Sequence, residues 1–239
     1  MPAYNAARYI EESVESVLAQ TYTDWELLIT NDASSDKTLE IAQALAQRDP
    51  RIKVFSLAQN GGVTAARNNS IEHAAGEYIA YLDSDDLWVP DKLTKQLEFM
   101  TEHQVDVCYS AYLRIDETGT QIGHVTPPAT LDYTKLLKSN FIGNLTGIYN
   151  AQRLGKRMLT TFRHEDYVAW LALVKQAGNA AGLKEPLGLY RVYGGSLSSN
   201  KLKTIGWQWR IYRQSERLGL VYSLWLMACY AWYALAKRA

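Results

Sequence analysis

Short apolar runs alternate with amphipathic segments through the first half of this 239-residue chain. The runs have the length of buried β-strands: Trp25–Thr30, Ile52–Leu57 and Glu77–Leu82. The segments around them place apolar residues on one helical stripe: Arg8–Gln20, Leu39–Ala46, Thr64–Ala75 and a segment that begins at Pro90. Strands and helices that alternate at this spacing require crossover connections, so the sequence predicts an α/β fold with a mostly parallel sheet.

The pattern changes after Val105. A longer strand, Val105–Ile115, is followed by turn residues at Glu117-Thr118-Gly119, which indicates that the sheet becomes mixed there. Ser35 is placed to cap the second helix of the first half. The two cysteines, Cys108 and Cys229, are too few for a disulfide framework or a cysteine-based zinc site.

The charge is balanced overall, with 25 Lys and Arg against 25 Asp and Glu, so composition gives no indication of a nucleic-acid partner. The charge is, however, distributed unevenly along the chain. Residues 184–239 hold nine basic and two acidic residues, a net charge of +7, and residues 1–183 carry −7. An acidic catalytic body with a basic tail and ordinary solvated helix faces explain this split equally well.

Polar clusters follow the predicted strands, where open α/β sheets bind their ligands. Asp83-Ser84-Asp85-Asp86 follows Glu77–Leu82, and carboxylates there can hold Mg²⁺ or Mn²⁺ together with a diphosphate. The alternative is a loop in which Asp86 and Asp91 cap the helix that begins near Pro90.

Two further clusters have a ligand-binding interpretation and a structural alternative. Asp32 can accept hydrogen bonds from a nucleobase, or form an Asx turn before Ser34. The segment Asn60-Gly61-Gly62 with Arg67 can approach a diphosphate, or be an ordinary loop with a surface arginine.

A third acidic site opens a strongly apolar segment in the second half. Glu165-Asp166 stands where acids compensate a helix dipole, or where a general base is held at a rigid helix start. Trp170, one turn further on, is expected in the core rather than stacked on a sugar.

Taken together and in this order, these clusters resemble the family 2 glycosyltransferases, which are nucleotide-sugar-dependent enzymes of the GT-A fold. The likeness is dense over about the first 100 residues, and it is closest to bacterial enzymes that build O-antigen, capsule or exopolysaccharide chains. The matching segments are Pro2-Ala3-Tyr4-Asn5, Ser16–Thr21, Glu26–Asp32 with Ser34-Ser35-Asp36, Asn60-Gly61-Gly62 with Ala66-Arg67-Asn68, Gly76–Ile79 leading into Leu82–Asp86, Pro90–Leu93, and Glu165-Asp166.

The resemblance implies a role for each candidate residue. Asp32 resembles the aspartate that binds the nucleobase, and Arg67 lies in the segment that approaches the nucleotide. Asp83 and Asp85 match the Asp-x-Asp motif that binds Mn²⁺ or Mg²⁺, and Asp166 matches the catalytic base of an inverting displacement. The residues implied to line the nucleobase pocket are Pro2, Ala3 and Tyr4.

The resemblance also implies an apolar strand before Pro2, of which this sequence contains only Met1. That strand would lie centrally in the sheet, so its absence is expected to expose apolar surface and unpaired backbone groups. We therefore expect residues 1–200 to form a GT-A catalytic domain that begins within its first strand, and residues 201–239 to form a helical tail.

The basic and aromatic residues of the tail indicate that it contacts a membrane surface. Lys201–Arg217 places Arg210, Arg213 and Arg217 on one helix face, and Leu218–Ala236 contains no charge but many aromatic residues. We expect this helix to lie on the inner leaflet of the plasma membrane, with an apolar helix docked on the catalytic domain and a true span as alternatives. That placement is expected for a cytoplasmic, peripheral enzyme, and it suits the acceptor that the family resemblance implies, a polyprenol-linked saccharide.

Three other functions compete with this interpretation. A nucleotidyltransferase would need a glycine- and lysine/arginine-rich phosphate loop near the first strand, and the sequence shows none. A non-catalytic sugar- or lipid-binding subunit would need neither Asp85 nor Asp166. A dinucleotide oxidoreductase is disfavoured because no Gly-x-Gly-x-x-Gly follows a strand.

Overall fold

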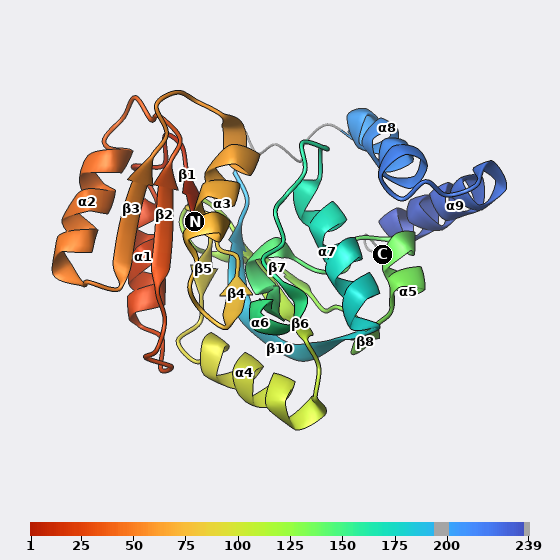
Figure 1. Cartoon of the computed structure of the whole chain (residues 1–239), viewed down its shortest axis with the longest axis horizontal. Coiled ribbons are helices and arrows are strands. Elements are labelled where there is room, and N and C mark those ends of the chain that lie inside the picture. The colour runs from red at the N-terminus through yellow and green to blue at the C-terminus, as the bar shows by residue number, and fades with distance from the viewer. Residues whose placement is uncertain (194–200, 237–239) are drawn as a thin grey trace.

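The computed structural model describes residues 1–193 and 201–236. Its strands form two sheets, flanked by helices (Figure 1). The smaller sheet has the order β1-β2-β3 and is parallel. The larger one has the order β4-β9-β6-β10-β5, with β7 on β6 and β8 on β10. The strands are β1 (Pro2–Ala3), β2 (Leu27–Asn31), β3 (Ile52–Ser56), β4 (Tyr78–Ala80), β5 (Leu87–Trp88), β6 (Val107–Ile115), β7 (Gln121–Val125), β8 (Thr130–Leu131), β9 (Ile148–Asn150) and β10 (Ala180–Arg191).

The predicted α/β fold with a mixed sheet is confirmed, but the prediction of a mostly parallel sheet is wrong, because most pairings among the described strands are antiparallel. In the larger sheet β6 and β10 are parallel, whereas β4, β5, β7, β8 and β9 pair antiparallel. The helices are α1 (Ile10–Leu18), α2 (Thr38–Arg48), α3 (Gly62–His73), α4 (Lys92–His103), α5 (Tyr133–Lys138), α6 (Ala151–Leu154), α7 (Glu165–Ala177), α8 (Lys201–Arg210) and α9 (Leu220–Ala236). A 3₁₀ turn, η1 (Asn144–Thr146), precedes β9, and a π-helical turn, η3 (Ile211–Ser215), follows α8.

The start of α2 differs from the prediction. Ser35 does not cap this helix, which begins at Thr38 and has no side-chain cap at its N-cap residue. The turn before it is held instead by Asp36, whose Oδ1 accepts a hydrogen bond from the Thr38 amide at 2.9 Å. A carboxylate that accepts from the amide two residues on competes successfully with a serine cap at this position.

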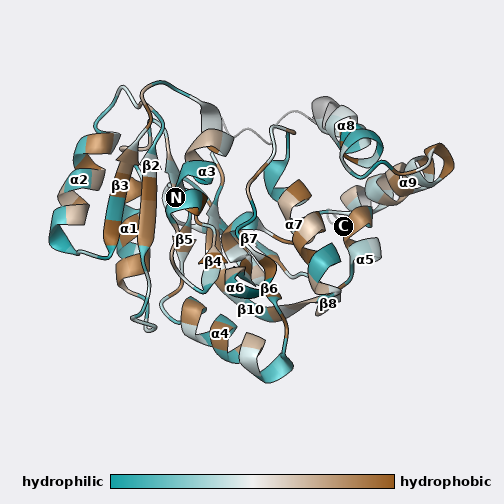
Figure 2. Ribbon diagram, in the orientation of Figure 1, coloured by the Kyte–Doolittle hydropathy of each residue, from teal (hydrophilic) through white to brown (hydrophobic). Residues whose placement is uncertain are grey.

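Hydrophobic residues are frequent in the strands and along the helices (Figure 2), and the buried ones form two apolar clusters. Helix α7 lies across the larger sheet, and Trp170 in its second turn is fully buried against Tyr81 and Tyr149. The ring of Trp170 lies over Gly147, where an added Cβ would approach a ring carbon to 2.2 Å. The expectation that Trp170 belongs to the core is therefore confirmed.

The tail helix α9 packs beside α5 and α8 at the end of the molecule opposite α2 (Figure 1). Ser223 and Leu226 are buried at this contact, and the ring of Tyr233 meets Phe141 edge-on at 5.2 Å. The outer face stays apolar and open, because Val221 is 81% exposed and Trp232 is 71% exposed. None of the helices in the described ranges combines the length and apolar character needed to cross a bilayer.

The predicted basic face of the tail is interrupted. Helix α8 ends at Arg210, Arg213 lies in the π-helical turn, and Arg217 has a left-handed backbone (φ 52°) beyond it. The three arginines therefore do not share one continuous helix, although they stay within a short stretch of chain. The part of the predicted helix at 201–203 has no described side chains, and residues 194–200 lie outside the described structure.

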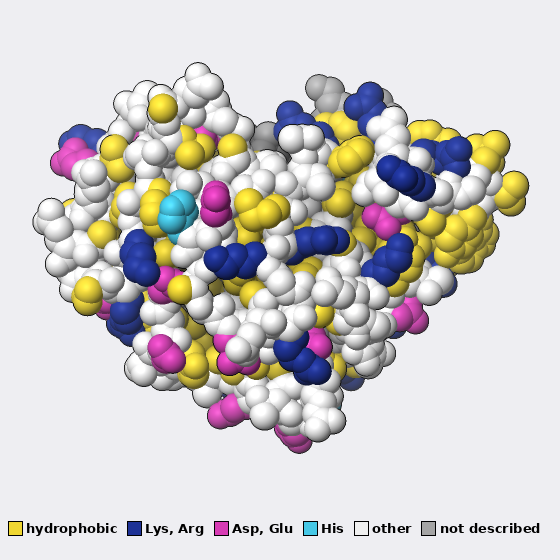
Figure 3. Space-filling model, in the orientation of Figure 1, with side chains coloured by type: hydrophobic (Ala, Val, Ile, Leu, Met, Phe, Trp, Pro, Cys, Tyr) yellow, Lys and Arg dark blue, Asp and Glu magenta, His cyan; other side chains and the backbone are white. Residues whose placement is uncertain are grey.

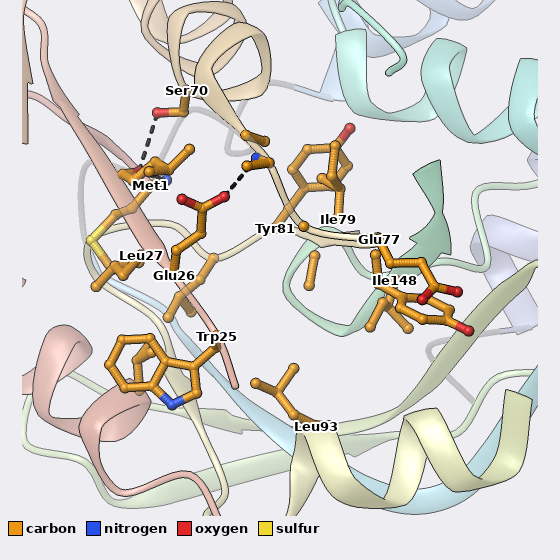
Figure 4. Close-up of a pocket in the computed structure, with 18 of the residues that line it drawn as sticks. Met1, Trp25, Glu26, Leu27, Ser70, Glu77, Ile79, Tyr81, Leu93 and Ile148 are labelled. Atoms are coloured by element: carbon orange, nitrogen blue, oxygen red, sulfur yellow. Dashed lines mark hydrogen bonds between the residues drawn. The ribbon is translucent and has the colours of Figure 1, made fainter. Parts of the chain in front are cut away.

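A cavity of about 550 Å³ separates the two sheets. It is bounded by β2 on one side and β4 on the other, with apolar side chains from α4 and β9 closing it (Figure 4). β1 is only two residues long, and no pairing joins it to β4 in the part of the chain that the structure describes. The cavity therefore has the position that a strand between β2 and β4 would occupy.

The amino group of Met1 lies at the end of this cavity. It is fully buried and donates a hydrogen bond to the Leu28 carbonyl at 2.7 Å. Burial, followed by the positive charge of Arg67, lowers the pKa of this amine from 8.0 to about 5. The unfolded chain keeps the proton up to a higher pH than the folded chain does, so stability is expected to rise as the pH increases from about 5 to 8.

Filling the cavity is expected to stabilise the protein. An extension of about five alternating Ile and Val residues before Met1 should pair with β2 and β4, bury apolar surface, and raise the Tm by about 10 °C. It should also abolish the pH dependence, because the buried amine becomes an amide. Calorimetric unfolding measures both effects. A Gly-Ser extension of equal length is the control, and an equal Tm for the two extensions would contradict the prediction.

Candidate active site

The carboxyl ends of β1 and β2 lie side by side. Ala3 pairs in register with Asn31, and the Asp32 amide donates to the Ala3 carbonyl at 2.8 Å. Asp32 is buried, whereas Tyr4 directly after β1 is 53% exposed. Of the three residues expected to line a nucleobase pocket, Pro2 and Ala3 are buried in the strand, and only Tyr4 presents an exposed side chain.

Asp32 binds the loop that leads into α3. Its two carboxylate oxygens accept hydrogen bonds from the amides of Gly61 (2.7 Å) and Gly62 (2.8 Å). These amides belong to the unpaired N–H groups at the start of a helix, where negative charge is favourable. Gly62 has φ +82°, a conformation that favours glycine. The Asx-turn alternative for Asp32 is wrong, because the carboxylate contacts residues 29 and 30 positions away.

Arg67 on α3 is the centre of the acidic site. It is only 4% exposed, so the alternative of a surface arginine is wrong. Its guanidinium donates to Asp83 at 2.5 Å and to Glu165 at 3.2 Å. Burial alone lowers the pKa of Arg67, but the negative charges of Asp83 and Glu165 outweigh this effect and raise it above its ordinary value. Arg67 thus joins the loop after β4 to the start of α7.

Removing this guanidinium is expected to destabilise the fold. Arg67→Met should lower the free energy of unfolding by about 3 to 5 kcal/mol, because two carboxylates lose their buried counter-charge. Arg8→Met is the matched control, since its ion pair with Glu117 is exposed and should contribute about 0 to 1 kcal/mol. Urea unfolding measures both. Equal losses for the two variants would contradict the importance of the buried network.

Hydrogen bonds from the end of β10 and from the residues that follow it hold the acidic loop after β4, Asp83–Asp86, in place. The Arg191 amide donates to the buried carboxylate of Asp86 at 2.9 Å, and its guanidinium donates to the Asp85 carbonyl at 2.9 Å. The Tyr193 hydroxyl donates to Asp85 Oδ2 at 2.9 Å. The alternative in which Asp86 caps a helix is therefore wrong, because its carboxylate bonds to a strand 105 residues further along the chain.

The loop concentrates negative charge. Burial and then the charge of Asp83 raise the pKa of Asp85, and burial and then Asp85 raise the pKa of Asp86. Asp83 keeps one oxygen clear of Arg67, and Asp85 keeps one clear of Tyr193. Two neighbouring carboxylates that each keep an oxygen available have the chemistry of a divalent-cation site. Asp83 and Asp85 therefore fit the predicted cation, with further ligands left to water and diphosphate. The described residues contain no cluster of three or more potential metal-binding side chains.

Asp166 lies in the first turn of α7, beside this network. It is close enough to Arg67 to raise the pKa of the guanidinium, and its charge, after burial, raises the pKa of Glu165. The preceding residue, His164, has a left-handed backbone with φ 60°. The site thus brings Asp83, Glu165 and Asp166 around Arg67, with Asp85 next to Asp83, while Asp32 contacts the N-terminal end of the same helix α3.

The two residues that hold the acidic loop in place could not be identified from the sequence. Arg191 and Tyr193 lie at the far end of β10, and the Arg191 guanidinium also donates to Glu12 on α1 at 2.6 Å. No local spacing connects these residues with the acidic loop.

The chain is similar to known glycosyltransferases. The sequence profile of Glycosyl transferase family 2 matches residues 1–185. The chain is 40% identical over 239 residues to a putative teichuronic acid biosynthesis glycosyltransferase, TuaG, of Bacillus subtilis, covering 99% of this chain and 95% of the relative. It is 36% identical over 212 residues to the Escherichia coli UDP-Glc:alpha-D-GlcNAc-diphosphoundecaprenol beta-1,3-glucosyltransferase WfgD, covering 88% and 83%.

Solved structures with low sequence identity share the fold. The Staphylococcus aureus protein TarS 1-349, solved in complex with UDP-GlcNAc, superimposes with a TM-score of 0.75 at 20% identity, over 96% of this chain and 70% of that one. The mannosyltransferase PcManGT from Pyrobaculum calidifontis, in complex with GDP-Man and Mn²⁺, gives a TM-score of 0.67 at 16% identity, over 100% and 74%. With the family profile covering most of its length, this chain belongs to Glycosyl transferase family 2.

Proposed function

We propose that this protein is an inverting glycosyltransferase that moves a sugar from a nucleotide-diphosphate donor to a lipid-linked saccharide in bacterial surface-polysaccharide synthesis. The observation that carries the proposal is the meeting of two acidic segments at Arg67: the loop Asp83–Asp86 after β4 and the pair Glu165-Asp166 at the start of α7. One segment is suited to a cation and a diphosphate, and the other to a base, so the reaction centre lies between them.

The roles follow from the charge that develops during transfer. Asp83 and Asp85 would hold a divalent cation, which when bound would supply a counter-charge for the leaving diphosphate. Asp166 takes the proton of the acceptor hydroxyl as this oxygen attacks the anomeric carbon from the face opposite the leaving group. Attack from that face inverts the configuration and requires no covalent intermediate. Arg67 orients Asp83 and Glu165 on either side of the reaction centre.

The nucleoside end of the donor is assigned to the ends of β1 and β2. The exposed ring of Tyr4 can stack on a base next to Asp32, whose oxygens each accept one hydrogen bond from the described part of the chain. Each oxygen therefore has capacity for a further N–H donor from the base. Arg67 is engaged by protein carboxylates, so direct contact of its guanidinium with the donor stays a prediction.

The acceptor class comes from the relatives. WfgD, by its name, glucosylates a sugar carried on diphosphoundecaprenol, and TuaG is assigned to teichuronic acid biosynthesis. Both are covered over most of their length by this chain. The structure supports the same acceptor class, because the exposed apolar face of α9 is suited to the surface of a lipid bilayer.

The proposed reaction is tested with purified full chain, a panel of UDP- and GDP-sugars, and a GlcNAc-diphosphoalkyl acceptor. We expect one donor to yield a disaccharide product and free nucleoside diphosphate, with activity lost in EDTA and restored by Mn²⁺. NMR of the new linkage should show an inverted anomeric centre. Release of inorganic diphosphate would instead indicate a nucleotidyltransferase, and binding without turnover would indicate a non-catalytic subunit.

Membrane binding depends on the outer face of α9 (Figure 3). Val221, Trp225 and Trp232 share that face, with Arg213 and Arg217 nearby along the chain. Replacing both Val221 and Trp232 with Asn should lower binding to anionic vesicles about tenfold or more, because apolar area inserted into the interface is lost. High salt should release the parent chain, since attraction between basic residues and anionic lipid is screened.

The matched control is Ile122→Asn on β7, a residue with 51% exposure that lies outside the tail. It should leave vesicle binding unchanged in co-sedimentation. Equal binding by the Val221/Trp232 variant and the parent chain would show that α9 is a docked helix with no membrane role.

A further inference from the structure

A second, polar pocket lies beside the segment that leads into α7. Its volume is about 250 Å³, and it separates the segment before α7 from the helix α8 and the turn η3. We call it the arginine pocket. Its lining residues are Thr161, Phe162, Arg163, Trp207, Arg210 and Gln214.

The arginine pocket is electropositive. It contains two guanidinium groups, an amide, a hydroxyl and an indole, and no carboxylate contributes to the lining. Arg163 and Arg210 form no ion pair with any described carboxylate, in contrast to the buried Arg67 and Arg191. The Arg163 guanidinium lies 5.8 Å from the centre of the Trp207 ring, which holds it at the pocket. Two guanidiniums that line one polar cavity, with no ion-pair partner among the described carboxylates, are suited to a multiply charged phosphate group.

The arginine pocket and the acidic site share one short piece of chain. The left-handed backbone at His164 turns the chain, so that Arg163 faces α8 while Glu165 faces Arg67 on α3. The His164 ring packs edge-on against Trp207 at 5.3 Å, and its Nε2 is buried without a hydrogen-bond partner in the structure. Arg163 is three residues from Asp166, so their Cα atoms lie within about 11 Å of each other.

We propose that the arginine pocket binds the diphosphate of the acceptor and thereby places the first sugar after the lipid at Asp166. This inference rests on the proposed function and names the part of the acceptor that the enzyme recognises. The short chain distance between Arg163 and Asp166 leaves room for about one sugar ring between the diphosphate and the base. The preferred acceptor is therefore a monosaccharide attached directly to a diphospholipid.

The lipid has a path from this pocket to a bilayer. Arg210 and Gln214 belong to α8 and η3, which lead directly into α9. Helices α8 and α9 lie at the same end of the molecule, where α9 exposes its apolar face (Figures 1 and 3). A diphosphate held in the arginine pocket thus lies near the surface proposed to rest on the membrane.

The test compares the parent chain with an Arg163→Gln/Arg210→Gln double variant. Three probes share one sugar and one short alkyl chain and differ only in linkage: diphosphate, monophosphate or a plain glycoside. Calorimetry without donor should show that the parent chain binds the diphosphate probe about 30-fold tighter than the glycoside, because charge-assisted hydrogen bonds are lost with the phosphates. The double variant should bind the probes about equally. In turnover, its KM for the diphosphate acceptor should rise about 30-fold, with kcat and the donor KM within about threefold of the parent values.

Arg157→Gln is the matched control, because Arg157 is an exposed arginine of the same connecting segment outside the pocket. It should retain the parent preference. Inorganic diphosphate alone should bind more weakly than the alkyl diphosphate probe.

The outcomes separate this inference from the proposed function. Retention of the diphosphate preference by the double variant would overturn the arginine pocket while leaving glycosyl transfer intact. Equal affinity for inorganic diphosphate and the alkyl probe would also overturn it, since the site would then not recognise an acceptor. Arginine-dependent binding of the probe without any sugar transfer would support the pocket and overturn the proposed reaction.

Discussion

Replacing Asp166 with Asn is expected to lower kcat by about 10²- to 10⁴-fold and to leave donor affinity within about twofold. The amide has nearly the same shape as the carboxylate but cannot take the proton of the acceptor hydroxyl. Asp166 is close enough to Arg67 to interact electrostatically, yet no protein hydrogen bond to its carboxylate is found within the described residues. Because the carboxylate has no evident structural partner there, its loss should affect chemistry more than folding.

Transfer assays and donor titrations by calorimetry separate these effects. The control is Asp132→Asn, since Asp132 caps α5 by accepting a hydrogen bond from the Lys135 amide at 2.7 Å. The control should cost a small amount of stability and leave kcat unchanged. If Asp166→Asn behaved like this control, Asp166 would serve only to compensate the dipole of α7, and the base would have to be sought elsewhere.

The fold and the acidic clusters could be predicted because each is indicated by residues that lie close together in the sequence. Apolar runs of strand length, followed by Asp32 and by Asp83–Asp86, are visible within a few residues of each other. The partners of these acids could not be predicted in the same way. Arg67 was expected to face a diphosphate or the solvent, and the structure buries it between two carboxylates from separate segments.

Arg191 shows the same limit more clearly. It contacts Glu12, Asp85 and Asp86, and the first of these contacts spans 179 residues of sequence. Such contacts depend on which strands become neighbours, and hydrophobic periodicity does not determine strand order. The short first strand was visible in the sequence, but the division into two sheets became evident only in the paired strands.

The second large effect is expected from Asp85→Ala. This substitution should reduce kcat/KM with Mn²⁺ by about 10³-fold or more, because a ligand charge that a water molecule cannot replace is removed next to the leaving diphosphate. Its neighbour Asp83 cannot compensate alone, since one of its oxygens is already bonded to Arg67. Affinity for Mn²⁺, measured by titration in the presence of the donor's nucleoside diphosphate, should fall in parallel.

Comparing Tyr193→Phe with Asp85→Ala distinguishes the positioning of the Asp85 carboxylate from its direct binding of the cation. The phenol donates to Asp85 Oδ2 at 2.9 Å, so the variant loses one hydrogen bond while both carboxylates remain. Residues that orient metal ligands typically change metal affinity by about 10- to 100-fold, so saturating Mn²⁺ should restore most of the Tyr193→Phe activity and none of the Asp85→Ala activity. An Asp85→Ala enzyme with parent kcat and parent Mn²⁺ affinity would contradict the cation site. The acidic loop would then serve chiefly to join β4 to β10 through Arg191.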